Sequence, residues 1–472
     1  MHDREEIYIN GKWVKAEGTE KIKVVNPSNE EIIGYIPAGN KEDVDHAIKS
    51  AKEAFITWSK SGIEKRMEIL NSLSSLFKER GEELAQIITS EVGTPIGYSR
   101  TAMVGTPRVV ARSYAKILET YDWEEEIRNS LIIKEPVGVC AFITPWNFPL
   151  HQIIGKVAPA IAAGCTMILK PSKEAPLSAF ILAEIFDEIG LPAGVFNLVT
   201  GHGSEIGEYL AKHSDVDMVS FTGSTGAGVA VSHAAADSVK RVTLELGGKS
   251  ANVALEDVDP ILFAKKAIQA CHQNSGQTCS ALTRLIIPKE MEEEICRVIV
   301  ERNDNYKVGN PLDEETRCGP MVSAKQQISV TNYIQRGIDE GATLISGGVG
   351  MPEGLTRGFY VKPTVFKDVS PEMTIWREEI FGPVLVIKTY ENEEEALELA
   401  NDSVYGLSGG VWSQDEERAL KFARNMRTGQ ISINGGFFNV NAPFGGYKTS
   451  GNGRELGVHG LEEFLELKSI QR

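Results

Sequence analysis

The stretch VGVCAFITPWNFPLHQIIGKVAPAIAAGCTMILK, residues 137–170, decides the fold. It predicts an apolar strand over 137–143, a helix over 149–163 and a second apolar strand over 166–170. The same rhythm continues along the chain, with apolar runs at 195–199, 217–221 and 241–245 and helix-like segments near 177–189, 204–212 and 226–237. Short apolar strands that alternate with helices predict a parallel sheet covered on both faces, with right-handed crossovers.

The alternation of predicted strands and helices resumes after Gly248 and predicts a second α/β domain over about 248–447. Its expected helices and strands are 257–273, 283–288, 291–304, 343–346, 383–389 and 430–433. Upstream, apolar residues at helical spacing predict an amphipathic helix over 42–58. The charged stretch 119–135 and the weakly alternating tail 461–470 lie outside both domains. Outlying strands of this kind often pair across subunits.

Length and composition exclude several classes of protein. A chain of 472 residues predicts two to three domains, and 42% hydrophobic with 24% charged residues is ordinary globular composition. The formal net charge of −16 argues against binding to nucleic acid or to an anionic membrane surface. The stretch 136–155 lacks charged side chains, but its prolines break any spanning helix.

The six cysteines form no CxxC pair, so neither a metal site nor a redox dithiol is indicated. So few thiols in so long a chain fit a reducing compartment, and the polar, acidic N-terminus has none of the order of a signal peptide. We therefore expect a cytoplasmic protein.

Two glycine turns follow predicted strands and suggest a cofactor site, because doubly wound sheets bind ligands beyond the carboxyl ends of their strands. They are VTGHGSEIG, with Gly203, and FTGSTGAG, with Gly223 and Ser224. Neither matches GxGxxG followed by an acidic residue. Exposed N–H groups at the helix start after Gly223 suit a pyrophosphate, and Lys170 at a strand end suits a ribose hydroxyl. The alternatives are two helix caps and a solvated lysine.

Three side chains are candidates for chemistry. Cys279, in QNSGQTCSA, follows a helix through a tight turn that would present its thiol to a cleft, whereas Cys271 lies mid-helix and is expected to be buried. Glu245 is a carboxylate in an apolar strand and is either paired or a base with a raised pKa. Asn147, in PWNFP, offers an amide donor for an oxyanion. Spacing alone leaves a purely structural role open for each.

Taken together, these motifs resemble those of the aldehyde dehydrogenase superfamily, over nearly the whole chain. The matching segments include ITPWNFPL (143–150), LKPS (169–172), LELGGK (244–249), GQTCSA (276–281), EEIFGPV (378–384) and PFGGYKTSGNGRELG (443–457). The resemblance implies a Rossmann-like NAD(P)-binding domain over 1–118 and 137–247, a catalytic domain over 248–447, and a small β oligomerisation element over 119–136 and 448–472. It also implies a homodimer or homotetramer.

The resemblance also implies a reaction. Cys279 matches the nucleophile, Glu245 the general base and Asn147 the oxyanion-stabilising amide of a non-acylating enzyme. An aldehyde would form a cysteine thiohemiacetal, lose hydride to NAD(P)⁺ and leave a thioester, which glutamate-activated water would hydrolyse to the acid. Two alternatives are an acylating enzyme that uses coenzyme A, against which Glu245 argues, and a catalytically silent relative, which would be expected to lack the nucleophile or the base.

The resemblance also implies which residues of this chain contact the cofactor and the substrate. The expected cofactor contacts are Ile143, Trp146, Lys170, Lys173, Gly203, Gly223, Ser224, Glu379 and Phe381. Lys173 stands where the family motif KPSE commonly has its acidic residue, so we expect NADP⁺ to be accepted. The expected substrate wall comprises Phe148, His151, Phe438 and Phe444. Gly155 replaces a common tryptophan, which argues against a quaternary-ammonium aldehyde and for a roomier pocket that takes aliphatic or aromatic aldehydes.

Overall fold

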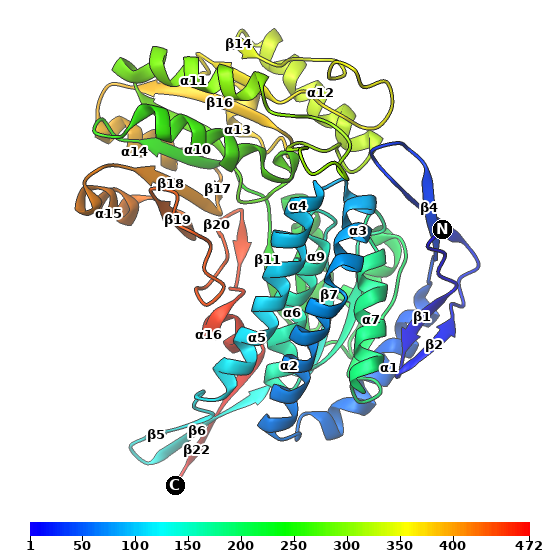
Figure 1. Ribbon diagram of the computed structural model, residues 1–472. Helices are drawn as coiled ribbons and strands as arrows, with labels where there is room; N and C mark the ends of the chain where they lie inside the picture. The colour runs from blue at the N-terminus through cyan, green and yellow to red at the C-terminus, as the bar shows by residue number, and fades with distance from the viewer.

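The computed structural model describes residues 1–472 and has two large sheets, mainly parallel with antiparallel edge strands, each covered by helices (Figure 1). The first sheet has the strand order β2-β1-β9-β8-β7-β10-β11-β21. Its strands are β1 (Glu6–Ile9), β2 (Lys12–Lys15), β7 (Val139–Ile143), β8 (Thr166–Lys170), β9 (Phe196–Leu198), β10 (Met218–Thr222), β11 (Arg241–Glu245) and β21 (Gly451–Asn452). The five strands from β9 to β11 are parallel, which confirms the predicted α/β fold.

The helices of the first domain include those predicted near 42–58, 149–163, 177–189 and 226–237, together with four between residues 63 and 118 that the sequence pattern did not predict. They are α1 (Lys41–Trp58), α2 (Ile63–Glu79), α3 (Gly81–Val92), α4 (Ile96–Tyr98), α5 (Thr106–Leu118), α6 (Pro149–Ala163), α7 (Leu177–Ile189), α8 (Glu208–Lys212) and α9 (Thr225–Ala236). The helix expected near 204–212 instead begins as a π-helical turn, η2 (Gly203–Gly207), before α8. A second π-helical turn, η1 (Ser99–Gly105), joins α4 to α5.

The second sheet has the order β14-β15-β16-β13-β12-β18-β19. Its strands are β12 (Ser250–Ala254), β13 (Leu282–Pro288), β14 (Thr343–Ser346), β15 (Thr364–Lys367), β16 (Val384–Tyr390), β18 (Ser408–Trp412) and β19 (Gln430–Ile433). Its helices are α10 (Pro260–His272), η3 (Gln273–Gly276), η4 (Lys289–Met291), α11 (Glu292–Asp304), α12 (Ala324–Asp339), α13 (Thr374–Arg377), α14 (Glu393–Asn401) and α15 (Glu416–Asn425). The helix expected from 257 starts at Pro260, because the Asp259 carboxylate caps the N–H groups of Ile261 and Leu262.

Three small sheets complete the fold: β3 (Lys21–Val25) with β4 (Ile32–Pro37), β17 (Tyr405–Gly406) with β20 (Tyr447–Lys448), and a three-stranded sheet β22-β6-β5. The last contains β5 (Glu124–Ile127), β6 (Ser130–Pro136) and β22 (Leu465–Gln471), and it extends away from the body beside the C-terminus (Figure 1). The tail strand begins at Leu465 rather than 461, because α16 (Gly457–Glu462) precedes it. The expected outlying element 448–472 is also divided, since β21 pairs with β11 of the first sheet.

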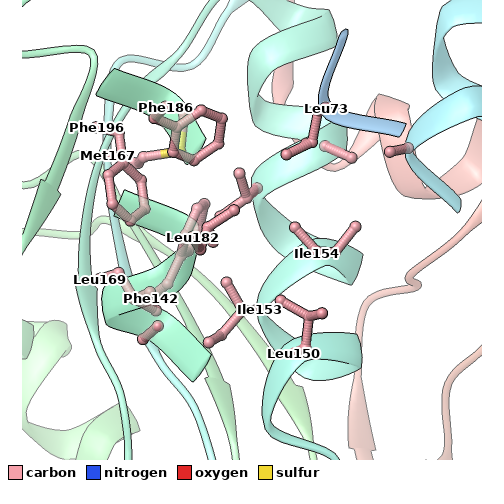
Figure 2. Close-up of a cluster of buried hydrophobic side chains, with 14 of the residues drawn as sticks. Leu73, Phe142, Leu150, Ile153, Ile154, Met167, Leu169, Leu182, Phe186 and Phe196 are labelled. Atoms are coloured by element: carbon pink, nitrogen blue, oxygen red, sulfur yellow. The ribbon is translucent and has the colours of Figure 1, made fainter. Parts of the chain in front are cut away.

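The core of the first domain surrounds α6. Every residue of this helix except His151 is buried, and Figure 2 shows Ile153 on the side of Phe142 and Leu182, and Ile154 on the side of Leu73. At its C-terminal end, the Arg66 guanidinium donates to the carbonyl oxygens of Ala162 and Ala163 at 3.2 and 2.9 Å. These bonds satisfy carbonyls that the helix leaves unpaired. The helix that follows Asn147 is therefore anchored at its C-terminal end and buried along almost its whole length. No helix in the structure is both long and apolar enough to span a membrane.

Candidate active site

The order of strands in the first sheet marks a ligand crevice. From β7 the chain winds outward through β8 and β9 on one side, and then continues through β10 and β11 on the other side. A crevice opens beyond the carboxyl ends of the strands where the winding reverses, here between β7 and β10. Thr144, Gly223 and Leu246 follow directly after β7, β10 and β11. Three loops of the first sheet therefore lie at the edge where this crevice opens.

A cavity of about 230 Å³ lies at this edge, and eight of the predicted residues line it. They are Trp146, Asn147, Gly223, Ser224, Glu245, Cys279, Glu379 and Phe381. Six further lining residues were not predicted: Pro145, Gln152, Thr222, Leu246, Gly247 and Gln326. Gln152 follows Phe148 by one helical turn and could have been found from that spacing. Gln326 comes from α12, and nothing local in the sequence connects it with the motifs.

Four predicted cofactor residues lie beside this cavity without lining it. Ile143 and Lys170 are paired across β7 and β8. The Lys170 ammonium donates only to the carbonyl oxygen of Pro171, at 3.1 Å, and lies 3.9 Å from where a β-carbon would stand at Gly203. Burial and the nearby charge of Lys173 lower the pKa of Lys170 to about 8. Lys173 itself is half-exposed, with a 3.7 Å ion pair to Glu174.

The loop before Cys279 adopts an unusual backbone. Asn274, Ser275 and Gly276 have φ values of +50°, +57° and +73°, so three successive residues are left-handed. A β-carbon at Gly276 would lie 2.1 Å from the carbonyl oxygen of Gly382, so only glycine fits there. Such strain persists only where surrounding contacts over-determine the conformation.

Those contacts come from several directions. Thr94 donates to the Asn274 side chain at 2.7 Å, the Ser275 hydroxyl donates to the Gly319 carbonyl at 3.0 Å, and the Gln277 side-chain oxygen accepts from the Val322 N–H at 2.9 Å. All of these partners are buried. The loop therefore holds the backbone of Cys279 in one position.

Cys279 is the only cysteine that is not fully buried, whereas Cys271 is completely buried, as predicted. Desolvation, together with the Glu379 and Glu245 carboxylates, raises the pKa of the Cys279 thiol to about 12, against the opposing effect of the Ser280 N–H. The thiol is therefore protonated near neutral pH, and a nucleophile at this position needs a group that removes its proton.

Glu245 is such a group. Its carboxyl group is 5% exposed, and neither oxygen has a hydrogen-bond partner. Desolvation and the nearby Glu455 carboxylate raise its pKa well above the ordinary value, while Lys156 and Arg454 act in the opposite direction. Because unpartnered buried carboxylates are costly, this arrangement is typical of a site that accepts protons rather than of a structural ion pair.

Asn147 is fixed by a reciprocal exchange with the cysteine loop. Its side-chain amide donates to the Gln277 carbonyl at 3.0 Å, and its own carbonyl accepts from the Asn274 amide at 2.9 Å. Only one N–H of the Asn147 amide has a partner in this exchange. The second N–H is the donor that an oxyanion near Cys279 would need.

Glu379 and Phe381 lie on the opposite wall of the cavity. The Glu379 carboxylate accepts from the Gly248 N–H at 2.9 Å, and burial raises its pKa to about 7. Phe381 has a φ of +56° and contacts Trp146 edge-on, with 5.5 Å between the ring centroids. Gln326 donates to the Phe381 carbonyl at 2.9 Å, which explains how α12 supports this wall.

The four predicted substrate residues form a chain of rings. Centroid distances are 6.4 Å for Phe148–His151, 6.2 Å for His151–Phe438 and 6.0 Å for Phe438–Phe444. Tyr98, which was not predicted, extends the chain at 6.3 Å from Phe148. Tyr98 directly precedes the π-helical turn η1, a kind of irregularity that is frequent at functional sites.

Comparisons with known proteins point to one family. The model of the Aldehyde dehydrogenase family matches residues 13–470. A relative from Pseudomonas sp, named 3-succinoylsemialdehyde-pyridine dehydrogenase, is 47% identical over 473 residues, covering 100% of this chain and 99% of the relative. A putative aldehyde dehydrogenase of Staphylococcus aureus (strain MSSA476) is 44% identical over 472 residues, with the same coverage.

Solved structures are equally similar. A mutant of aldehyde dehydrogenase C from Pseudomonas syringae, in complex with NAD⁺ and octanal, has a TM-score of 0.98 and 46% identity, covering 99% of this chain and 96% of that one. An aldehyde dehydrogenase of Mycobacterium tuberculosis in complex with NAD⁺ has a TM-score of 0.97 and 40% identity, covering 100% and 98%.

The left-handed turn generates a first prediction. Gly276→Ala should slow alkylation of Cys279 by iodoacetamide and lower the unfolding midpoint, because its β-carbon would collide with the Gly382 carbonyl. Gly190→Ala is the matched control, since Gly190 also has a φ of +73° but has nothing within 4 Å of its β-carbon position. In the Gly190→Ala control the free energy of unfolding should fall by only about 1–2 kcal/mol, which is the cost of a left-handed backbone conformation for alanine. Equal effects of the two variants would contradict the steric argument.

The carboxylates around the thiol generate a second prediction. Glu379→Gln should lower the pKa of Cys279, because it removes a negative charge that disfavours the thiolate. Alkylation of Cys279, followed by mass spectrometry, should become about threefold faster at pH 9 and stay unchanged at pH 6, since the Glu379 carboxyl has a pKa of about 7 and is largely protonated there. The exposed neighbour variant Glu378→Gln should leave both rates alone. Faster alkylation at pH 6 as well would mean that the substitution had moved the loop that carries Cys279.

Proposed function

This chain belongs to the aldehyde dehydrogenase family, whose members oxidise aldehydes with a nicotinamide cofactor, and we propose how its own residues divide that reaction. Cys279 is the nucleophile, Glu245 the general base and Asn147 the oxyanion donor. The observation that carries this proposal is their shared cavity: the thiol, an unpartnered buried carboxylate and an amide with a spare N–H line the same space.

The residues of the crevice fit NAD(P)⁺. Gly203 has only the Lys170 ammonium near its β-carbon position, at 3.9 Å, and Lys170 has no carboxylate partner. Ser224 caps the start of α9, whose first N–H groups suit an anion. Lys170 and Glu379 would accordingly bind ribose hydroxyls, and Trp146 and Phe381 would flank the nicotinamide end. When bound, the cofactor supplies a hydride acceptor.

The protein's own groups carry the other steps. Glu245 accepts the Cys279 proton, directly or through water, and the sulfur attacks the aldehyde carbon to form a thiohemiacetal. The Asn147 amide and the Cys279 backbone N–H hold the oxygen while negative charge develops there. Loss of hydride from carbon leaves a thioester. Glu245 releases its first proton to solvent and then takes a proton from water as the water oxygen attacks the thioester carbon. The carbon–sulfur bond breaks, the carboxylic acid leaves, and Glu245 returns its proton to the Cys279 sulfur.

A raised pKa suits Glu245 to this work. A carboxyl with an ordinary pKa near 4.5 is a weak base at neutral pH, whereas desolvation and Glu455 make the Glu245 carboxylate more basic. An acylating enzyme that transfers the acyl group to coenzyme A remains the second candidate. A base in the same cavity as the thiol favours water over an external thiol, so we prefer hydrolysis. The presence of both groups likewise argues against a silent relative.

The proposed substrates are aliphatic or aromatic aldehydes. One similar structure contains octanal, and one relative is named for an aromatic semialdehyde, 3-succinoylsemialdehyde-pyridine. The wall from Tyr98 to Phe444 suits either class, since it offers aromatic surface and Gly155 adds no side chain to it. Three further expectations stay predictions. They are a homodimer or homotetramer built through the β22-β6-β5 sheet, a catalytic domain over 248–447, and a cytoplasmic site of action.

Replacing the base tests the division of roles. Glu245→Gln should give a burst of about one reduced nicotinamide per active site, followed by turnover that is 10²- to 10⁴-fold slower than the unmodified enzyme, because the thioester forms but hydrolyses slowly. Cys279→Ala should give no burst, and Glu378→Gln should behave as the parent enzyme. Stopped-flow absorbance of the reduced cofactor with propanal measures all three. A normal steady-state rate in Glu245→Gln would refute its role, and full rescue by coenzyme A would favour the acylating alternative.

We propose separately that Lys173 favours NADP⁺ over NAD⁺, because its positive charge would attract the 2′-phosphate of NADP⁺. Lys173 already lowers the pKa of Lys170, so two cations lie close together with Glu174 as their one near carboxylate. A phosphate would relieve that repulsion.

Lys173→Glu should therefore lower kcat/KM for NADP⁺ about tenfold and leave that for NAD⁺ equal or higher. Initial rates with both cofactors measure the ratio, and Lys265→Glu on the distant helix α10 controls for net charge. A parent enzyme that strongly prefers NAD⁺, together with no change in Lys173→Glu, would overturn the proposal.

A further inference from the structure

One face of α6 borders the reaction cavity and carries side chains that the proposed mechanism does not use. Phe148, His151, Gln152 and Gly155 are spaced by three, four and seven residues, so they share one face of the first two helical turns. Phe148 and His151 belong to the chain of rings, and Gln152 lines the cavity with Cys279. Gly155 has no side chain on this face, and a β-carbon there would lie 3.0 Å from the Glu455 carboxylate.

Gln152 is a buried polar group without a bond. Its side chain is 6% exposed, and Oε1 has no hydrogen-bond partner. Most buried side-chain oxygens in folded proteins are paired, because leaving one unpaired is destabilising. Gln326 offers a contrast in the same cavity: its amide is satisfied by the Phe381 carbonyl at 2.9 Å. The Nε2 group of Gln152 makes no side-chain hydrogen bond either, so its N–H groups are free to donate to an oxygen that enters the cavity.

His151 provides a second unpaired group on the same turn. Its Nδ1 is buried and has no partner, and its ring stands between those of Phe148 and Phe438. Burial lowers the pKa of His151 to about 4; the Glu455 carboxylate opposes this shift and Lys156 adds to it. The imidazole is therefore neutral near pH 7 and offers one hydrogen-bond donor and one acceptor.

Charge limits what these two residues can bind. No lysine or arginine lines the cavity, while the Glu245 and Glu379 carboxylates both do. A substrate with an anionic tail would meet two acidic groups and no cation. A neutral oxygen, such as a ketone or a hydroxyl, matches an amide and a neutral imidazole without a charge penalty.

We propose that Gln152 and His151 form a polar subsite that binds a ketone or hydroxyl oxygen on the carbon chain of the aldehyde. The enzyme then selects oxo- or hydroxy-aldehydes over plain alkanals of the same size. This inference rests on the proposed function, because it assigns the substrate of the same thiol. Gln152 acts beside the reacting carbon, and His151 acts further along the chain of rings.

The test compares two aldehydes of equal length, 4-oxopentanal and 4-methylpentanal, in which a methyl group replaces the ketone oxygen. The parent enzyme should have the higher kcat/KM for 4-oxopentanal. Gln152→Met should lower that value about tenfold, mainly through KM, and leave 4-methylpentanal unchanged or improved, since one neutral hydrogen bond is lost. His151→Leu should act in the same direction. Gln335→Met, on the exposed face of α12, is the control and should change neither substrate.

Other outcomes separate the possible failures. If Gln152→Met slows both aldehydes equally, the residue orients Glu245 or its water, and the subsite is refuted. If the parent enzyme prefers 4-methylpentanal and the ratio survives both substitutions, the subsite is also refuted. Calorimetric binding of the two aldehydes to Cys279→Ala provides a readout without turnover. A preference for 4-oxopentanal there, with no oxidation by the parent enzyme, would refute the proposed reaction and retain the subsite.

Discussion

The reciprocal hydrogen bonds between Asn147 and the cysteine loop are the contact on which the site depends. Asn147 follows β7 of the first sheet, while Asn274 and Gln277 belong to the turn that leads into the second. Glu245 comes from the first sheet and Cys279 from the second domain, so neither domain contains the reacting groups alone. The exchange fixes the relative position of the two loops, and an error of about 1 Å in such a position costs roughly two orders of magnitude in rate.

Much of this could be predicted from the sequence, for physical reasons. Strands buried on both faces are continuous apolar runs, so β8 and β11 appear with the residue bounds that their sequence pattern predicts, as does the helix α6 between Pro149 and Ala163. Residues named from short motifs, such as Trp146, Glu245 and Glu379, lie around one cavity. Trp146 and Glu245 follow or end strands at one edge of the first sheet, whereas Glu379 lies in the loop between α13 and β16.

What escaped prediction depends on contacts between distant segments. The strands β1 and β2 join the first sheet, yet nothing in Glu6–Lys15 says which strand they will pair with. The π-helical turn at Gly203 carries no signal that separates it from an α-helix. Gln326 was missed for a different reason: a glutamine on a helix is ordinary, and only the packed structure shows that its amide bonds the Phe381 carbonyl, while the Gln152 side-chain oxygen has no partner.

The return of the chain to its first sheet has a consequence for biosynthesis. The strand β11 receives its outer neighbour, β21, from residues 451–452, and β6 receives β22 from residues 465–471, more than two hundred residues after β11 itself. During translation the first domain emerges long before these segments, so it waits with two unpaired strand edges while the second domain is made. Exposed strand edges can pair with strands of other chains, so the nascent chain is open to association until residues 451–471 leave the ribosome.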